Sequence, residues 1–257
     1  MNRGMVDTKE INSNFLKPDF DGKSGNLYIC GNKIVKIYAK EGQNGKLFIP
    51  PDPNKICDFS KYMADTIVFP LQYIYENGVI VGEISKYIKS KHIGESFNGH
   101  AKIKPIIDSY EQVRSDMQLY DNIDMRDLCY VNILYSNKNG FHLIDTTDWQ
   151  YKDNSLPINI YRFDSSLIDT IISYAKIMNY DKQGRYVINE NLYENIAKYG
   201  NAGKRLQNNI DLIINDKYRF LEFLFAFMEV YQIHYSEEME SLKELKEMTK
   251  VLKKGWF

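Results

Sequence analysis

Hydrophobic and polar residues in the first third of the chain alternate over short runs, which is the pattern typical of β-strands. The runs form two pairs, and each pair is joined by a tight turn that contains Gly and Asn. The four runs are residues 27–30, 34–38, 71–75 and 79–84. A Pro-rich stretch and a segment of helical character, residues 55–65, separate the two pairs. This region therefore predicts a small, five-stranded antiparallel sheet with one helix.

Beyond Gly99 the apolar positions recur at helical spacing. They predict a helix over residues 101–120 and then a short β pair, residues 131–135 and 141–144. From Asp164 onward the pattern predicts helices only, the first of them capped by Asp164 or Ser165. The later helices are expected at residues 189–198, 204–215, 217–235 and from 236 to near the end of the chain. The fold class predicted is α+β, with a β-rich region at residues 1–88 and a mainly helical region at residues 89–257.

Composition narrows the classes of partner. The 257 residues are 44% hydrophobic and 26% charged, as in ordinary globular proteins, and the net charge is −1. Such a balance gives no general attraction to nucleic acid or to an anionic membrane, so neither is expected as a partner. The most apolar run, residues 220–233, contains two glutamates and is too short to span a bilayer. The widely spaced cysteines form no CxxC pair, and the first residues lack a signal-peptide core, so a cytoplasmic location is expected.

The most informative segment is a polar loop followed by a hairpin, residues 123–149. Asp127 and Asn132 lie five positions apart on the loop, and Asp145 follows the second apolar strand of the hairpin. A carboxylate and an amide oxygen are hard ligands that suit Mg²⁺. A further carboxylate close by could accept the proton of a hydroxyl nucleophile. The alternative is that Asp127 and Asn132 only stabilise the loop through local hydrogen bonds.

This segment resembles the catalytic loop and metal-binding strand of the protein kinase-like superfamily, H-R-D-L-x-x-x-N followed by I-D-F-G. The resemblance implies a two-lobed fold with a small antiparallel β lobe and a mainly helical lobe, which binds ATP with Mg²⁺. It also implies that Asp127 is the catalytic aspartate and that Asn132 and Asp145 hold the metal. The reaction implied is transfer of the γ-phosphate of ATP to a hydroxyl acceptor on a small molecule or a protein.

Three upstream segments match further parts of the same family. Gly22, Ser24 and Gly25 stand at the place of the glycine-rich loop, although the third glycine of the family is absent. Lys36 matches the strand lysine that pairs with the α- and β-phosphates. The hinge that meets the adenine edge would comprise the backbone of residues Lys86, Tyr87 and Ile88, with Ser85 at the gatekeeper position. The motifs cover residues 20–150, and the remainder resembles the family only in being helical.

Several positions depart from the family pattern. Met125 replaces a histidine, and Cys129 stands where a lysine or histidine is usual, which removes a cation from beside the transferred phosphate. Asp145-Thr146-Thr147 replaces D-F-G, and no glutamate partner for Lys36 is evident, since Glu41 is too close in sequence and Asp58 is short. No A-P-E sequence follows, which favours the aminoglycoside phosphotransferase-like side of the superfamily or a minimal bacterial relative.

These departures leave two functional classes open. The first is an active ATP-dependent phosphotransferase, favoured by the complete set of Asp127, Asn132 and Asp145. The second is a nucleotide-binding pseudokinase with a regulatory or interaction role, favoured by Cys129 and by the missing partner of Lys36. The acceptor and the oligomeric state are open as well, because resemblance in fold does not name a substrate.

Overall fold

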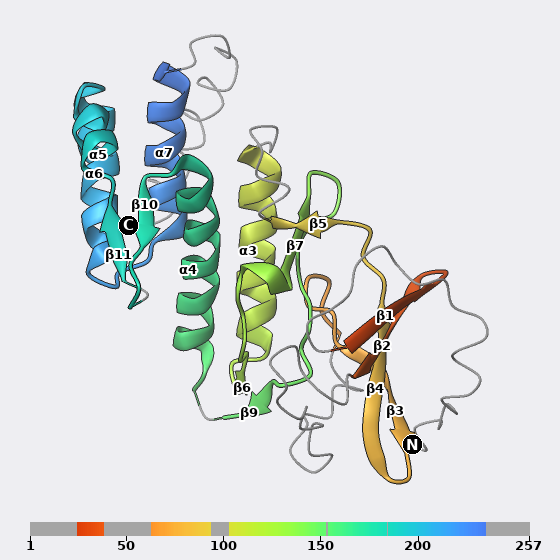
Figure 1. The fold of residues 1–257 in the computed structure, drawn as a ribbon. Helices are drawn as coiled ribbons and strands as arrows, with labels where there is room; N and C mark the ends of the chain where they lie inside the picture. Colours follow the sequence, from red (N-terminus) through yellow and green to blue (C-terminus); the bar gives the residue numbers. More distant parts are fainter. Residues whose placement is uncertain (1–24, 39–62, 94–102, 153, 184, 235–257) are drawn as a thin grey trace. The chain divides into compact units, whose positions relative to one another are not determined.

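The computed structural model describes residues 25–38, 63–93, 103–152, 154–183 and 185–234 (Figure 1). In this part the chain is mixed α+β, with a small antiparallel sheet towards the N-terminus and helices towards the C-terminus. It divides into two compact units, one of Met1–His92 with Asp108–Ile160 and one of Ile93–Ile107 with Tyr161–Phe257. The lobe boundary that we expected near residue 88 stays a prediction.

The first unit contains a four-stranded antiparallel sheet of order β1-β2-β4-β3. Its strands are β1 (Gly25–Cys30), β2 (Lys33–Tyr38), β3 (Pro70–Glu76) and β4 (Val79–Lys86). Residues with positive φ make the two hairpin turns, Gly31 at 58° in one and Asn77 at 50° with Gly78 at 80° in the other. The four strands predicted from alternation are confirmed. The described residues supply no fifth strand to this sheet, and the expected helix at 55–65 lies almost entirely outside them.

A second, three-stranded sheet in the first unit has the order β5-β7-β8. It is formed by β5 (Lys91–His92), β7 (Ile133–Ser136) and β8 (Gly140–Leu143), and a one-turn 3₁₀ helix, η2 (Tyr130–Asn132), leads into β7. The predicted β pair is therefore confirmed. A further short pair, β6 (Ile123–Asp124) with β9 (Gln150–Tyr151), brackets the polar segment in sequence. The predicted helix before it is present as α3 (Ile103–Leu119).

The helix expected from Asp164 begins earlier, as α4 (Leu156–Ala175). The prediction of Asp164 or Ser165 as its cap was wrong, and Asp164 is a buried residue inside the helix. Pro157 is tolerated because it lies in the first turn, where the backbone N–H has no partner within the helix. The amide of Asn159 donates to the carbonyl of Ser155 at 3.1 Å, which is the first hydrogen bond of helical spacing.

The second unit is not wholly helical, contrary to the expectation from the sequence. An antiparallel hairpin of β10 (Met178–Tyr180) and β11 (Tyr186–Ile188) follows α4 (Figure 1). The helices α5 (Glu190–Ala197), α6 (Gly200–Ile214) and α7 (Phe220–His234) come next, close to where they were expected. The helix expected from Ser236 lies outside the described residues. None of the described helices combines the length and the apolar character that a membrane span needs.

Candidate active site

Asp127 and Asn132 are joined by direct hydrogen bonds. The amide nitrogen of Asn132 donates to the backbone oxygen of Asp127 at 2.8 Å and to its carboxylate Oδ2 at 3.2 Å. Asn132 is buried at the end of η2, whereas Asp127 is exposed on the loop and has φ of 53°. Because the amide nitrogen is engaged with Asp127, the Oδ1 atom of Asn132 is the part of this side chain suited to a cation.

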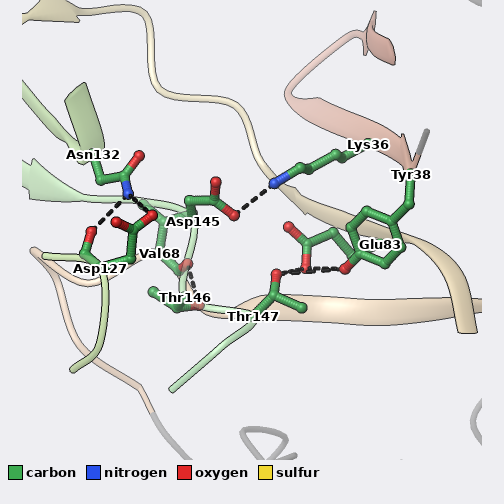
Figure 2. Close-up of polar contacts among 9 residues, drawn as sticks. All are labelled: Lys36, Tyr38, Val68, Glu83, Asp127, Asn132, Asp145, Thr146 and Thr147. Carbon is green, nitrogen blue, oxygen red and sulfur yellow. Dashed lines mark hydrogen bonds and ion pairs between the residues drawn. The ribbon is translucent and has the colours of Figure 1, made fainter. Parts of the chain in front are cut away.

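Asp145 follows β8 and lies next to Asn132. The amide of Ile144 donates to the backbone oxygen of Asn132 at 2.9 Å, and this main-chain hydrogen bond holds Asp145 close to Asn132. The Lys36 ammonium lies 2.6 Å from Oδ1 of Asp145 and 5.7 Å from the centroid of the Tyr38 ring (Figure 2). Asp145 also adopts a positive φ, 57°. The structure thus brings together four residues selected from the sequence, Lys36, Asp127, Asn132 and Asp145.

The two threonines that follow Asp145 are held by buried hydrogen bonds. Thr146 Oγ1 donates to the backbone oxygen of Val68 at 3.2 Å, and Thr147 Oγ1 donates to Oε2 of Glu83. Thr146 is 1% exposed and Thr147 is 5% exposed, so neither hydroxyl can exchange these partners easily for water. Hydroxyl contacts therefore fix the segment that follows Asp145.

Glu83 was not predicted from the sequence as a site residue, yet its carboxyl lies beside the side chains of Tyr38, Thr147 and Lys36 (Figure 2). It is 5% exposed and accepts from the hydroxyls of Tyr38, at 3.1 Å, and Thr147. Burial raises the pKa of the Glu83 carboxyl, and the positive charge of Lys36 opposes that rise. The sequence offered one signal for this residue, a glutamate inside the apolar run of residues 79–84. Its relation to Lys36 comes only from the strand register, in which Lys36 stands opposite Glu83.

The side chains nearest Asp127 add no cation to it. Cys129 Sγ lies 3.8 Å from Oδ1 of Asp127, and burial, together with the negative charge of Asp127, raises the pKa of this thiol. Cys129 is therefore a neutral thiol at physiological pH. Arg126 turns to the buried Asp124, with Nε 3.1 Å from Oδ2, rather than to Asp127. Cys129 thus places a neutral group beside Asp127.

Two of the three expected hinge residues, Tyr87 and Ile88, make contacts with other parts of the first unit. Tyr87 donates its amide to the backbone oxygen of Asn32 at 2.8 Å, which extends the pairing of β4 with β2. Because backbone groups alternate between the two sides of a strand, those of Lys86 point away from β2. The side chain of Ile88 packs with Val68 and Leu134 in a buried apolar cluster.

Gly25 has a structural reason to be glycine. A Cβ at this position would lie 2.2 Å from the backbone oxygen of Ile37 on the paired strand β2, far closer than a carbon can approach. Gly25 therefore permits the pairing of β1 with β2, and this need is independent of any phosphate. Gly22 and Ser24 lie outside the described residues, so the glycine-rich loop stays a prediction.

In the described residues, no group of three or more His, Cys, Asp or Glu side chains forms a ready-made metal site. The candidate ligands of Mg²⁺ are one carboxylate, Asp145, and one amide, Asn132, and such a pair suits a metal that also binds phosphate oxygens and water. Comparisons with protein-family models and with curated proteins found no match for this chain. What this chain does must therefore be inferred from the geometry of its side chains.

Proposed function

We propose that this protein is an ATP-dependent phosphotransferase with a two-lobed fold of the protein kinase-like type. The observation that carries the proposal is the contact between Lys36 and Asp145, which are 109 positions apart, beside the bonded pair of Asp127 and Asn132. These residues come from β2, the end of β8 and the loop that leads into β7. A purely structural loop does not require a lysine, two acids and an amide to converge from separate elements.

Each of these residues has a role in the proposed reaction. Oδ1 of Asn132 and a carboxylate oxygen of Asp145 hold Mg²⁺, for which oxygen donors of this kind are suited. Lys36 donates to the phosphate oxygens, for which its ammonium group offers three hydrogens. Mg²⁺–ATP, when bound, supplies the phosphoryl group that is transferred. Asp127, which is exposed, orients the acceptor hydroxyl and accepts its proton.

A buried apolar cluster includes Ile88 of the expected hinge, and in this proposal it backs the site of the purine. Val68, Ile88 and Leu134 are each 8–9% exposed and pack together, with the partly buried Ile144 against them. A flat aromatic base gains from contact with such side chains. The backbone of Lys86, which faces away from β2, supplies a carbonyl for the amino group of adenine.

A second candidate function is nucleotide binding without turnover. It is favoured by the neutral thiol of Cys129, because charge stabilisation supplies much of the catalysis in phosphoryl transfer. In that case Lys36, Asn132 and Asp145 bind Mg²⁺–ATP, and the bound state acts through an interaction with another molecule.

One experiment tests both functions. Thermal unfolding is recorded with ATP and Mg²⁺, with ATP and EDTA, and with Lys36→Met as the matched control; ATP turnover is then measured over a panel of hydroxyl acceptors, including aminoglycosides and proteins. Mg²⁺-dependent stabilisation with turnover supports the phosphotransferase. Stabilisation without turnover supports the pseudokinase, and the absence of any stabilisation at millimolar nucleotide contradicts both. A gain of turnover in Cys129→Lys would identify the missing cation as the cause of inactivity.

A further inference from the structure

Glu83 is a buried carboxylate on the same face of the sheet as Lys36. The two residues stand directly opposite each other in the antiparallel register of β2 and β4, so their side chains leave the sheet on one side. Tyr38, two residues after Lys36, lies on the same face and donates its hydroxyl to Glu83. The register and the hydrogen bond together fix Glu83 beside the base of the Lys36 side chain.

The two oxygens of the Glu83 carboxylate have different surroundings. Oε2 accepts both the Tyr38 and the Thr147 hydroxyl. Figure 2 shows the other oxygen, Oε1, on the side of the group where Lys36 and Asp145 meet. The charges of Lys36 and Asp145 both act on the Glu83 carboxyl, so the three groups form one electrostatic cluster.

A buried carboxylate is costly unless a positive charge compensates it. Hydroxyl groups satisfy the hydrogen bonds of the carboxylate but do not neutralise its charge. Lys36, the partner of Glu83 in the strand register, is a cation that can neutralise it. In this structure the ammonium of Lys36 is engaged with Asp145, the same acid that the proposed function assigns to Mg²⁺. If Asp145 held a divalent cation, its carboxylate would no longer be free to neutralise Lys36, and Lys36 would need another counter-charge.

We propose that Glu83 is this counter-charge, a positioning residue that holds Lys36 towards the phosphates when Asp145 binds a cation. The inference rests on the proposed function. The sequence offered no helical glutamate as the acidic partner of Lys36, and in this proposal Glu83 on strand β4 takes that place. Lys36 therefore exchanges Asp145 for Glu83, and Thr147, bonded to Glu83 and two residues from Asp145, keeps the two acids at a fixed spacing.

The first test needs no nucleotide. A double-mutant cycle of Lys36→Met and Glu83→Gln is measured by chemical denaturation in the Asp145→Asn background, where Lys36 has lost its first partner. Glutamine keeps the size of the side chain and an oxygen acceptor for both hydroxyls. We expect the two changes to be non-additive by about fivefold or more in the unfolding equilibrium constant, as for residues in contact. Additivity within about twofold would overturn the inference.

The second test uses Mg²⁺–ATP and the chain without the Asp145 change. Glu83→Gln is expected to raise the dissociation constant of Mg²⁺–ATP about tenfold. Glu76→Gln, at the exposed end of the neighbouring strand β3, is expected to leave it unchanged. Equal affinity in wild type and Glu83→Gln would contradict the positioning role. If Glu83→Gln does not fold, Glu83→Met combined with Tyr38→Phe and Thr147→Val replaces it in both tests, because these changes remove the two hydroxyl donors together with their acceptor.

The two tests separate the possible failures. No stabilisation of the wild type by Mg²⁺–ATP refutes the proposed function, while the denaturation cycle still decides whether Glu83 and Lys36 interact. Coupling in the cycle together with unchanged nucleotide affinity in Glu83→Gln shows a contact that serves stability alone, and this outcome also overturns the inference.

Discussion

Asp127 and Asp145 are both acids of the candidate site, but their contacts assign them different tasks. Asp145 contacts Lys36 and is the proposed metal ligand, so Asp145→Asn should abolish the Mg²⁺-dependent part of nucleotide binding. Asp127 contacts Asn132 and Cys129 and is the proposed base for the acceptor hydroxyl. Asp127→Asn should therefore keep nucleotide affinity within a few-fold and lower turnover by about 10²–10⁴.

Calorimetric titration with Mg²⁺–ATP and steady-state turnover distinguish these two effects. Asparagine is the suitable replacement, since it retains the size of the side chain and tolerates the positive φ of both positions. An equal loss of nucleotide affinity in the two variants would show that the division of roles is wrong.

His142 makes a second prediction at this scale, for stability against pH. The ring is 8% exposed on β8, and its Nδ1 atom has no hydrogen-bond partner among the described residues. Burial lowers the pKa of His142; the charge of Lys86 also lowers it, while the backbone of Gly140 and the carboxylate of Asp65 raise it.

A group with a lowered pKa in the folded state contributes stability above its ordinary pKa and loses that contribution as the pH falls. The free energy of unfolding should therefore decrease as the pH drops below about 6.5, the ordinary value for histidine. The slope should be at most about 1.4 kcal/mol per pH unit. Urea unfolding of wild type and His142→Leu between pH 7.5 and 5 measures the difference, and parallel curves would contradict the prediction.

At the scale of elements, the first turn of α4 holds β6, the strand that precedes the loop with Asp127. Asn159 is fully buried; its Oδ1 accepts from the amide of Met125 at 2.9 Å and its Nδ2 donates to the backbone oxygen of Ile123 at 2.6 Å. Asn159→Ala removes the hydrogen bond that each of these backbone groups makes to the Asn159 side chain. We expect a loss of about 2–6 kcal/mol in unfolding free energy, at about 1–3 kcal/mol for each buried group that loses its partner.

The control for this prediction is Ile158→Ala, which truncates an exposed side chain in the same helical turn and should cost far less. Chemical denaturation gives both values. Hydrogen exchange at the amide of Met125 should accelerate in Asn159→Ala alone. Equal stability of the two variants would show that β6 does not depend on this contact.

The elements show where sequence patterns carry enough information. The four N-terminal strands were predictable because alternation extends over several residues and Gly or Asn marks each turn. The strands of the β10–β11 hairpin, three residues each, are too short to display a period, so the pattern predicted no strand beyond Asp164. Asp164 resembled a cap because an acid before an apolar run often is one, and the structure buries it within α4.

In the candidate site, too, residues within local motifs could be predicted and a residue that depends on strand register could not. Lys36, Asp127, Asn132 and Asp145 could be selected because each lies in a local motif with fixed spacing. Glu83 could not, because its relation to Lys36 depends on the register between strands that are distant in sequence.

At the scale of the whole molecule, every described residue of the candidate site belongs to the first compact unit. Mg²⁺–ATP at a hundredfold excess over its dissociation constant should stabilise the fold that binds it by about 2.7 kcal/mol. We expect hydrogen exchange to slow mainly in β2, β4 and the segment after β8, and much less in α5 and α6. Native-state exchange with and without nucleotide measures this, with Asp145→Asn as the control that should show no protection.

Equal protection throughout the chain would mean that the two units open as one cooperative body. In that case the site would not be confined energetically to the first unit, although its residues lie there.

The hydroxyl contacts of Thr146 and Thr147 have a consequence for the design of inhibitors. Swinging the segment after Asp145 outward would break both buried hydrogen bonds, at about 1–3 kcal/mol each. The displaced arrangement is then populated at about three per cent or less. A compound that fits only that arrangement forfeits about thirtyfold or more in apparent affinity. Compounds that accept the segment where it stands forfeit nothing, so screening against this protein should favour compact purine mimics over elongated molecules that need the segment to open.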